Sequence, residues 1–225
     1  MKAERVPKSV MRRVLNFIYA FVILAVLIGV WLAPAGQSGG GYARRSAAMQ
    51  ESRVIGLCLY QYSLAHNGHY PEGKTSTEVF QHLIDEKYVD DPSIFYVGYM
   101  NTPEKVSPQG IRLKSENVCW DVTCCVDSSA PDGLPVVFLT GYKITYQPGS
   151  SAVPNIPLPE RNWFKQWLDS GIARSFMAVA FTSSTPTWGK SISARTIEAD
   201  EDGSIPNFIP ADFDPKGKTC RQLTP

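Results

Sequence analysis

The sequence predicts an α+β fold in which an N-terminal transmembrane helix and a flexible glycine-rich joint precede a head domain with a long leading helix and a small antiparallel sheet. Three observations support this prediction. Residues 14–33 contain no charged side chain, residues 42–68 repeat apolar side chains at helical spacing, and the rest of the chain holds short aromatic and β-branched runs separated by turn residues. The chain therefore divides into residues 1–13, 14–33, 34–41 and 42–225.

The uncharged segment has the length of a membrane span. Its twenty residues extend about 30 Å at a rise of about 1.5 Å per residue, which matches the hydrocarbon core of a bilayer. Residues 1–13 carry five basic side chains and one acidic one, and such basic clusters stay on the cytoplasmic side. We therefore expect a single-pass membrane protein with a cytoplasmic N-terminus and an extracytoplasmic domain at residues 42–225.

A cleaved signal peptide is the alternative to a retained anchor. Ala33-Pro34-Ala35 has the small-x-small pattern that signal peptidases accept. The apolar stretch is longer than the roughly 7 to 15 residues of a usual signal peptide, which favours the anchor. The sequence leaves open whether residues 1–35 are removed, and both alternatives place the head domain in the same compartment.

The head domain has the size and charge of one mildly acidic globular unit. Residues 42–225 hold 17 basic and 20 acidic side chains, and a chain of this length buries one sizeable core. Binding to nucleic acid requires a basic face that displaces counterions from phosphates. Nucleic acid is therefore not an expected partner.

The leading helix follows the joint at residues 34–41, where four of eight positions are glycine and the chain is expected to be flexible. Asn67-Gly68 ends this helix, because glycine adopts the left-handed conformation of a helix stop. The apolar side chains recur at helical spacing. The packing set that we expect on this helix is Val54, Ile55, Leu57 and Leu59.

A second helix is expected to begin after Thr75. The hydroxyl of Thr75 caps the helix, and Glu78 three residues later closes a capping box. The apolar face of this helix consists of Val79, Phe80, Leu83 and Ile84.

Runs rich in aromatic and β-branched residues predict the strands. A strand or other extended segment is expected at residues 93–100, and further strands at 118–126, 134–142 and 175–183. A short helix at 159–171 carries Trp163 and Trp167, which either fill the core or line a groove for a partner. The proline- and glycine-rich residues 148–159 and 203–225 are expected to be loops.

Five cysteines lie in the head domain. An extracytoplasmic location permits disulfides, and an odd number leaves at least one thiol unpaired in a monomer. The cysteines that we expect in disulfides are Cys119, Cys124, Cys125 and Cys220, with the pairing left open.

Motifs in residues 43–97 resemble a known family. The leading helix contains Ile55-Gly56-Leu57 and Leu59. The turn and the step that follow contain Tyr62, Gly68, Tyr70, Pro71, Asp91, Pro92, Ile94 and Phe95. This combination resembles type IV pilin-like proteins and type II secretion pseudopilins, in the divergent form found in planctomycete and verrucomicrobial bacteria.

The resemblance implies a pilin-like head on a membrane helix and a structural or assembly role, without enzymatic activity. It also implies an inner-membrane location, with membrane lipid and other pilin-like or secretion-system subunits as partners. The sequence departs from the family at its start: no acidic residue lies within 14–33, and no glycine-aromatic junction precedes that segment. We therefore do not expect prepilin-type cleavage.

The acidic residues late in the chain are the candidate metal ligands. Major pseudopilins of the resembled family hold calcium in a late loop, and the carboxylates that match this position are Asp200, Asp202, Asp212 and Asp214. Calcium is the possible cofactor of such a loop, because it takes about six to eight oxygen ligands from carboxylates and carbonyls. The spacing does not fit an EF-hand loop, and a solvated turn is the alternative.

The sequence contains no motif that favours an enzyme. Gly-x-Ser-x-Gly and phosphate-binding glycine loops are absent. His66 and His69 flank the Asn67-Gly68 turn, and we expect them to be solvated rather than catalytic. The alternative to an assembly protein is an anchored extracytoplasmic ligand- or glycan-binding module, in which Trp163 and Trp167 form an exposed aromatic platform.

Overall fold

The structure is a computed structural model. It describes residues 19, 21–24, 37–98, 105–124, 127, 130–155, 176–185, 189–200, 202–214 and 219–225. The chain divides into two compact units, Met1–Gly40 and Gly41–Pro225. Within the described part of the chain, no helix has both the length and the apolar character of a membrane span. Most of the predicted span at 14–33 lies outside the described residues.

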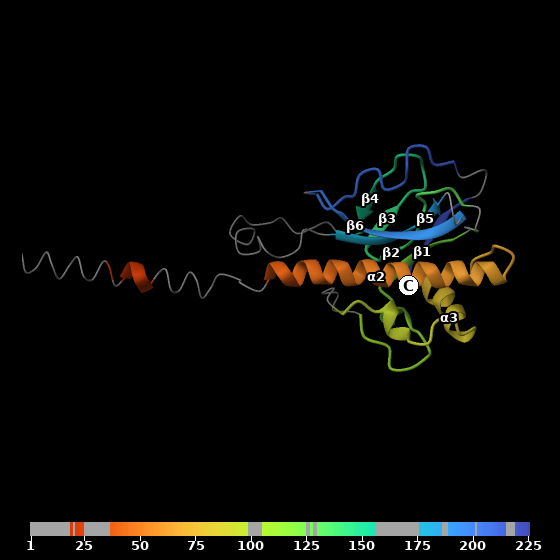
Figure 1. Ribbon diagram of the computed structural model, residues 1–225, viewed down its shortest axis with the longest axis horizontal. Helices are drawn as coiled ribbons and strands as arrows, with labels where there is room; N and C mark the ends of the chain where they lie inside the picture. Colours follow the sequence, from red (N-terminus) through yellow and green to blue (C-terminus); the bar gives the residue numbers. More distant parts are fainter. Residues whose placement is uncertain are drawn as a thin grey trace, which may run out of the picture. The chain divides into compact units, whose positions relative to one another are not determined.

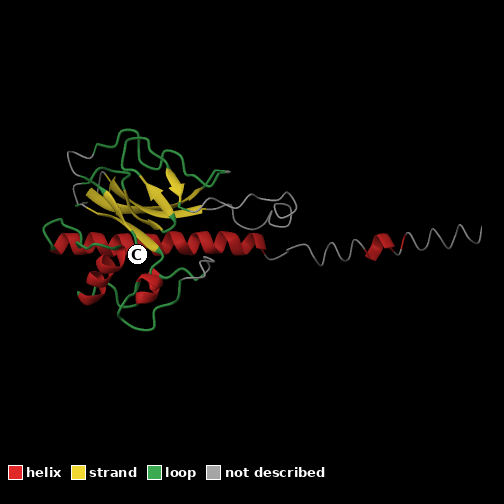
Figure 2. Ribbon diagram, turned by 180° about the vertical axis from the view of Figure 1, so that it is seen from behind, coloured by secondary structure: helices red, strands yellow, loops and turns green. Residues whose placement is uncertain are grey.

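The second unit is a mixed α+β domain, as the sequence predicts. The long helix α2 (Gln37–Ala65), most of which belongs to this unit, runs along one face of a five-stranded antiparallel sheet with the order β6-β5-β2-β1-β7. Figures 1 and 2 show the hairpin β3–β4 on the other side of this sheet and α3 on the side of α2 that faces away from it. The strands of the large sheet are β1 (Trp120–Cys124), β2 (Pro135–Leu139), β5 (Phe176–Thr185), β6 (Gly189–Glu198) and β7 (Arg221–Leu223).

Helix α2 begins earlier than predicted. Residues 37–41 are helical, so the prediction of a flexible joint at 34–41 is wrong for this part. Glycine is about 1 kcal/mol less favourable than alanine in a helix. Extending an existing helix avoids the cost of nucleation, however, so a glycine run at its first turns is tolerated.

The end of α2 agrees with the prediction. Asn67 and Gly68 both have positive φ, at 53° and 86°. The Gly68 N–H donates to the Ser63 carbonyl at 2.7 Å, which satisfies one of the last carbonyls of the helix.

The predicted packing set of α2 is half correct. Ile55 and Leu59 are fully buried, whereas Val54 and Leu57 are 45% and 36% exposed. The buried face includes Ser52 and Ser63, and a Cβ at Gly56 would lie 2.8 Å from Ile192 Cγ2 and 3.0 Å from Ala180 Cβ. Gly56 thus allows α2 to lie close to β5 and β6, whereas the larger side chains of Val54 and Leu57 are partly exposed on another side of the helix.

Helix α3 (Ser76–Asp85) confirms its predicted cap and face. Thr75 Oγ1 accepts a hydrogen bond from the Glu78 N–H at 3.2 Å. The Glu78 carboxylate accepts from the Lys74 N–H at 2.6 Å rather than from Thr75, so the capping box is shifted by one residue. The predicted apolar side chains Val79, Phe80, Leu83 and Ile84 are all buried.

The segment at 93–100 begins as a helix instead of a strand. Pro92–Phe95 form the 3₁₀ helix η1, because the Asp91 carboxylate accepts hydrogen bonds from Ser93 N and Ser93 Oγ at 2.9 and 2.7 Å. Proline at the first position fits this helix start. Phe95 then stacks on Phe80 with ring centroids 4.5 Å apart, which joins η1 to α3.

The three runs predicted as strands at 118–126, 134–142 and 175–183 correspond to β1, β2 and β5. The prediction that 148–159 and 203–225 are only loops is wrong. Ala152–Pro154 form β4, which pairs with β3 (Tyr142–Ile144), and Arg221–Leu223 form β7 at the edge of the large sheet. A second 3₁₀ helix, η2, covers Ser115–Asn117. The predicted helix at 159–171 lies outside the described residues.

Candidate functional site: a groove beside the last strand

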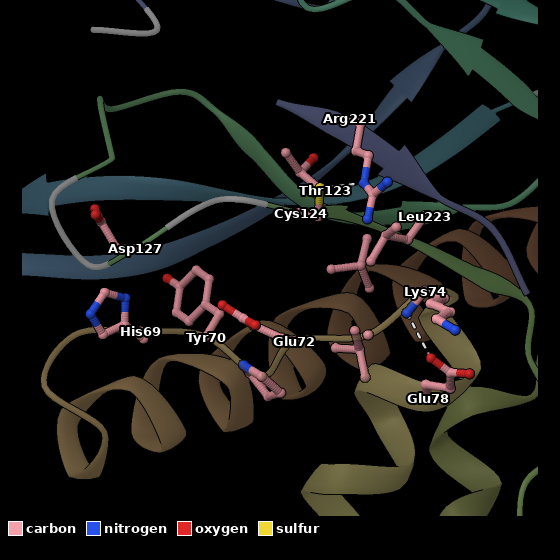
Figure 3. A pocket seen from close by; sticks show the side chains of 14 residues that line it. His69, Tyr70, Glu72, Lys74, Glu78, Thr123, Cys124, Asp127, Arg221 and Leu223 are labelled. Carbon is pink, nitrogen blue, oxygen red and sulfur yellow. Dashed lines mark hydrogen bonds between the residues drawn. The ribbon is translucent and has the colours of Figure 1, made fainter. Parts of the chain in front are cut away.

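The candidate site is a groove of about 700 Å³ between the segment that joins α2 to α3 and the strands β1 and β7 (Figure 3). One wall consists of residues 69–74 together with Glu78 and Val79 at the start of α3. The other wall consists of residues 122–124, 127, 221 and 223.

The joining segment is attached to the sheet at both ends. His69 forms an isolated antiparallel bridge with Asp127, just after the turn that ends α2. At the other end, the Ser76 N–H donates to the Thr224 carbonyl at 3.1 Å. Pro71 and the Thr75 cap keep the residues between these attachments out of a helix. The groove lies between the two attachments.

Apolar side chains from three elements form the floor of the groove. Leu223 comes from β7, Val122 from β1 and Val79 from α3, and all three are buried. Val122 pairs with Leu223 in the register of β1 and β7, and Cys124 pairs with Arg221. Because alternate residues of a strand face the same side, both pairs face the groove.

Charged side chains lie along the whole length of the groove, with Glu72 in its middle. Figure 3 shows Arg221 and Lys74 at the end near Leu223, and His69 and Asp127 at the other end. Arg221 Nε donates to Cys124 Sγ at 3.2 Å. Between the two ends, burial raises the pKa of the Tyr70 phenol above its ordinary value, so this hydroxyl stays neutral.

A buried polar cluster lies on the opposite face of β1 and β7. Gln222 Nε2 donates to Asp121 Oδ2 and to the Tyr142 carbonyl, both at 2.6 Å, and Gln222 Oε1 accepts from the Ile144 N–H at 3.1 Å. Burial raises the pKa of Asp121 to about 6, against the opposing effects of hydrogen bonds from Gln222 and Thr140. One side-chain amide thus connects β7 to both β1 and β3.

The predicted calcium ligands are not gathered into a site. Asp202 Oδ1 accepts from the Ser204 N–H at 2.9 Å, and the Gly203 N–H donates to the Asp200 carbonyl at 2.9 Å, as in a tight turn. The described residues contain no group of three or more acidic, histidine or cysteine side chains that could hold a metal. Asp212 and Asp214 therefore do not complete a ligand set with Asp200 and Asp202 there, and the structure gives the calcium prediction no support.

The predicted disulfides are not formed among the described cysteines. Cys119 is a buried thiol whose Sγ accepts a hydrogen bond from the Val97 N–H at 3.4 Å, so its predicted disulfide is wrong. Cys124 contacts Arg221, and Cys220 directly precedes β7. Cys125 lies outside the described residues.

The two histidines near the turn have different surroundings. The ring of His66 stacks on Tyr62 at 3.8 Å and its Nε2 lies 3.2 Å from Glu86 Oε2, whereas His69 lines the groove.

Trp163 and Trp167 lie outside the described residues. Sequence reasoning missed the groove and the Asp121–Gln222 cluster, because neither has a local motif.

Comparisons with protein families, with curated proteins and with solved structures give no match. The resemblance to pilin-like proteins stays a prediction from the residues that carry it.

Proposed function

We propose that this chain is a membrane-anchored, pseudopilin-like structural protein that acts in the assembly of a type II secretion or type IV pilus-related system. Residues 14–33 anchor it in the inner membrane with residues 1–13 in the cytoplasm and the head domain outside. It acts through contacts with other pilin-like or secretion-system subunits and is not an enzyme.

The observation that carries this proposal is a second apolar stripe on α2. Val54, Leu57 and Leu64 are 45%, 36% and 65% exposed. Their separations of three and seven residues place them on one side of the helix, in the repeat along which helices pair. We call these three residues the α2 seam. The seam is distinct from the face of Ile55 and Leu59 that packs in the core, so it is available to a neighbouring subunit.

The coarse architecture is compatible with the proposal. A long helix lies along a small antiparallel sheet, which is the arrangement that the resemblance implies for a pilin-like head. The motif Ile55-Gly56-Leu57 also has a structural explanation. Ile55 and Gly56 face inward, whereas Leu57 belongs to the seam.

Site-specific photo-crosslinking tests the proposal. A photoreactive amino acid is placed at Leu57 or Leu64 in the full chain, and crosslinked partners are identified from membranes of the native cell. Val153, a 52% exposed aliphatic residue on β4, is the matched control. We expect pilin-like or secretion-system subunits to crosslink at the two seam positions and not at Val153. Equal labelling at all three positions, or none with such subunits, contradicts the proposal.

The groove favours a second candidate function, an anchored binding module for a ligand. This alternative was predicted from exposed tryptophans as a glycan platform, whereas the described residues place the concave surface at β1 and β7. Two results together favour this alternative. A ligand binds saturably to the groove, and substitution of the α2 seam leaves assembly unchanged.

A further inference from the structure

We propose that the groove binds an extended peptide that ends in a free carboxylate beside an aliphatic side chain. The proposal concerns a different surface from the α2 seam and does not depend on pilin-like assembly. It rests on the backbone, the floor and the charges of the groove.

The backbone along one wall is unpaired. None of the hydrogen bonds between described residues involves the backbone of Pro71, Glu72 or Gly73, although His69 and Ser76 attach this segment to the sheet on either side. Unpaired backbone groups on a non-helical segment are a template for pairing with an added extended chain. This feature favours a peptide over a small carboxylate or a fatty acid.

The floor selects an aliphatic side chain. Val79, Val122 and Leu223 meet there from three different elements. Two of them belong to paired strands and the third to a capped helix, so the floor is held rigidly. A small apolar side chain of the ligand is removed from water when it lies on this surface.

The charges orient the ligand. Arg221 and Lys74 are exposed and belong to none of the ion pairs found in the described part of the chain. Arg221 uses only Nε, toward Cys124, so both terminal nitrogens of the guanidinium remain for a carboxylate in the two-pronged geometry that arginine favours. The Glu78 carboxylate accepts from the Lys74 N–H and keeps its negative charge beside Lys74, so the ligand carboxylate is assigned to Arg221 rather than to Lys74. Glu72 disfavours an anion in the middle of the groove, so the peptide carboxylate lies at the Arg221 end.

Fluorescence anisotropy with the full chain in mild detergent tests the proposal. The probe is an N-terminally labelled alanine peptide with a final leucine and a free C-terminal carboxylate. Its matched controls are the same peptide with a C-terminal amide and the same peptide with a final serine. We expect saturable binding of the first peptide and affinities lower by about tenfold or more for both controls.

Substitution of Arg221 identifies the site. In Arg221→Gln we expect the carboxylate and amide peptides to bind equally weakly, whereas Arg112→Gln, at an arginine that is also exposed, binds as the unmodified chain does. Thermal unfolding shows that both variants are folded. The proposal is overturned if no saturable binding occurs at millimolar peptide, or if Arg221→Gln still distinguishes carboxylate from amide. Displacement of the peptide by octanoate at equal concentration overturns the choice of a peptide and assigns the groove to fatty carboxylates.

Discussion

Asp121 is fully buried in the polar cluster on β1, and its carboxyl has only partial compensation for the loss of water. Oδ2 accepts from Gln222, whereas Oδ1 has no hydrogen-bond partner among the described residues. Desolvation disfavours the charged form and raises the pKa of this group to about 6, from 3.8. The protonated form therefore fits the folded state better than the carboxylate does.

Because of Asp121, the free energy of unfolding of the head domain is expected to decrease as the pH rises from about 4 to about 6. The pKa of Asp121 is higher in the folded chain than in the unfolded chain, so the folded chain binds its proton more tightly. This adds to stability fully below the unfolded-state pKa, and the gain is lost as the pH rises through the folded-state pKa. Asp121→Asn removes the charge and keeps an acceptor for Gln222. We expect this variant to be more stable than the unmodified chain at pH 7.5, by up to about 3 kcal/mol, and equally stable near pH 4.

Urea unfolding at a series of pH values, followed by tryptophan fluorescence, measures this difference. Asp90→Asn, at an exposed carboxylate, is the control and should leave the pH profile unchanged. If the profiles of Asp121→Asn and the unmodified chain run parallel from pH 4 to pH 7.5, burial of Asp121 does not govern this part of the stability.

At the scale of the elements, the approach of α2 to the sheet depends on Gly56. A methyl group there overlaps with Ile192 Cγ2 and Ala180 Cβ, neither of which is the flexible end of a long side chain. Overpacking of this kind costs about 1–3 kcal/mol, against a gain of about 1 kcal/mol in helix propensity. We expect Gly56→Ala to destabilise the domain by about 1 kcal/mol in urea unfolding, and Gly56→Leu by considerably more.

Gly110 provides the matched control for this prediction. A Cβ at Gly110 would meet no atom within 4 Å, so Gly110→Ala should change the stability by less than about 0.5 kcal/mol. A Gly56→Ala variant that is as stable as the unmodified chain would show that the helix–sheet contact is looser than these distances indicate.

Local sequence signals predicted the elements that are formed by local rules. Thr75 and Glu78 predicted the start of α3, and Asn67-Gly68 predicted the end of α2, because caps and stops depend on a few neighbouring residues. Strands with one continuous apolar run, such as β2, were equally clear. Strand β6 was not predicted because, among its described side chains, Ile192 is the one buried aliphatic residue and most neighbours are polar. Strand β7 was not predicted because three residues are too few for a pattern.

At the scale of the whole molecule, the groove and the polar cluster both depend on β7. Three segments that are distant in sequence meet there: residues 69–76, β1 and residues 219–225. Taken alone, the sequence of each segment predicts only a turn, a strand or a loop. The site exists only when the sheet is complete, so no motif in the sequence predicted it. The exposure of the α2 seam likewise depends on which side of α2 the sheet covers.

Deletion of residues 219–225 is expected to destabilise the domain by more than about 3 kcal/mol. It removes buried Leu223 from the core, the three hydrogen bonds of Gln222 and the acceptor of the Ser76 N–H, and it leaves β1 as a new unpaired edge. Urea unfolding of the full chain in mild detergent, followed by tryptophan fluorescence to which buried Trp120 contributes, measures the effect. Deletion of Pro225 alone is the control, and Leu223→Ala, expected to cost about 2–4 kcal/mol, keeps the prediction testable if the longer deletion does not fold. Unchanged unfolding midpoints for both the deletion and Leu223→Ala would show that the edge strand β7 does not contribute to the stability of the sheet.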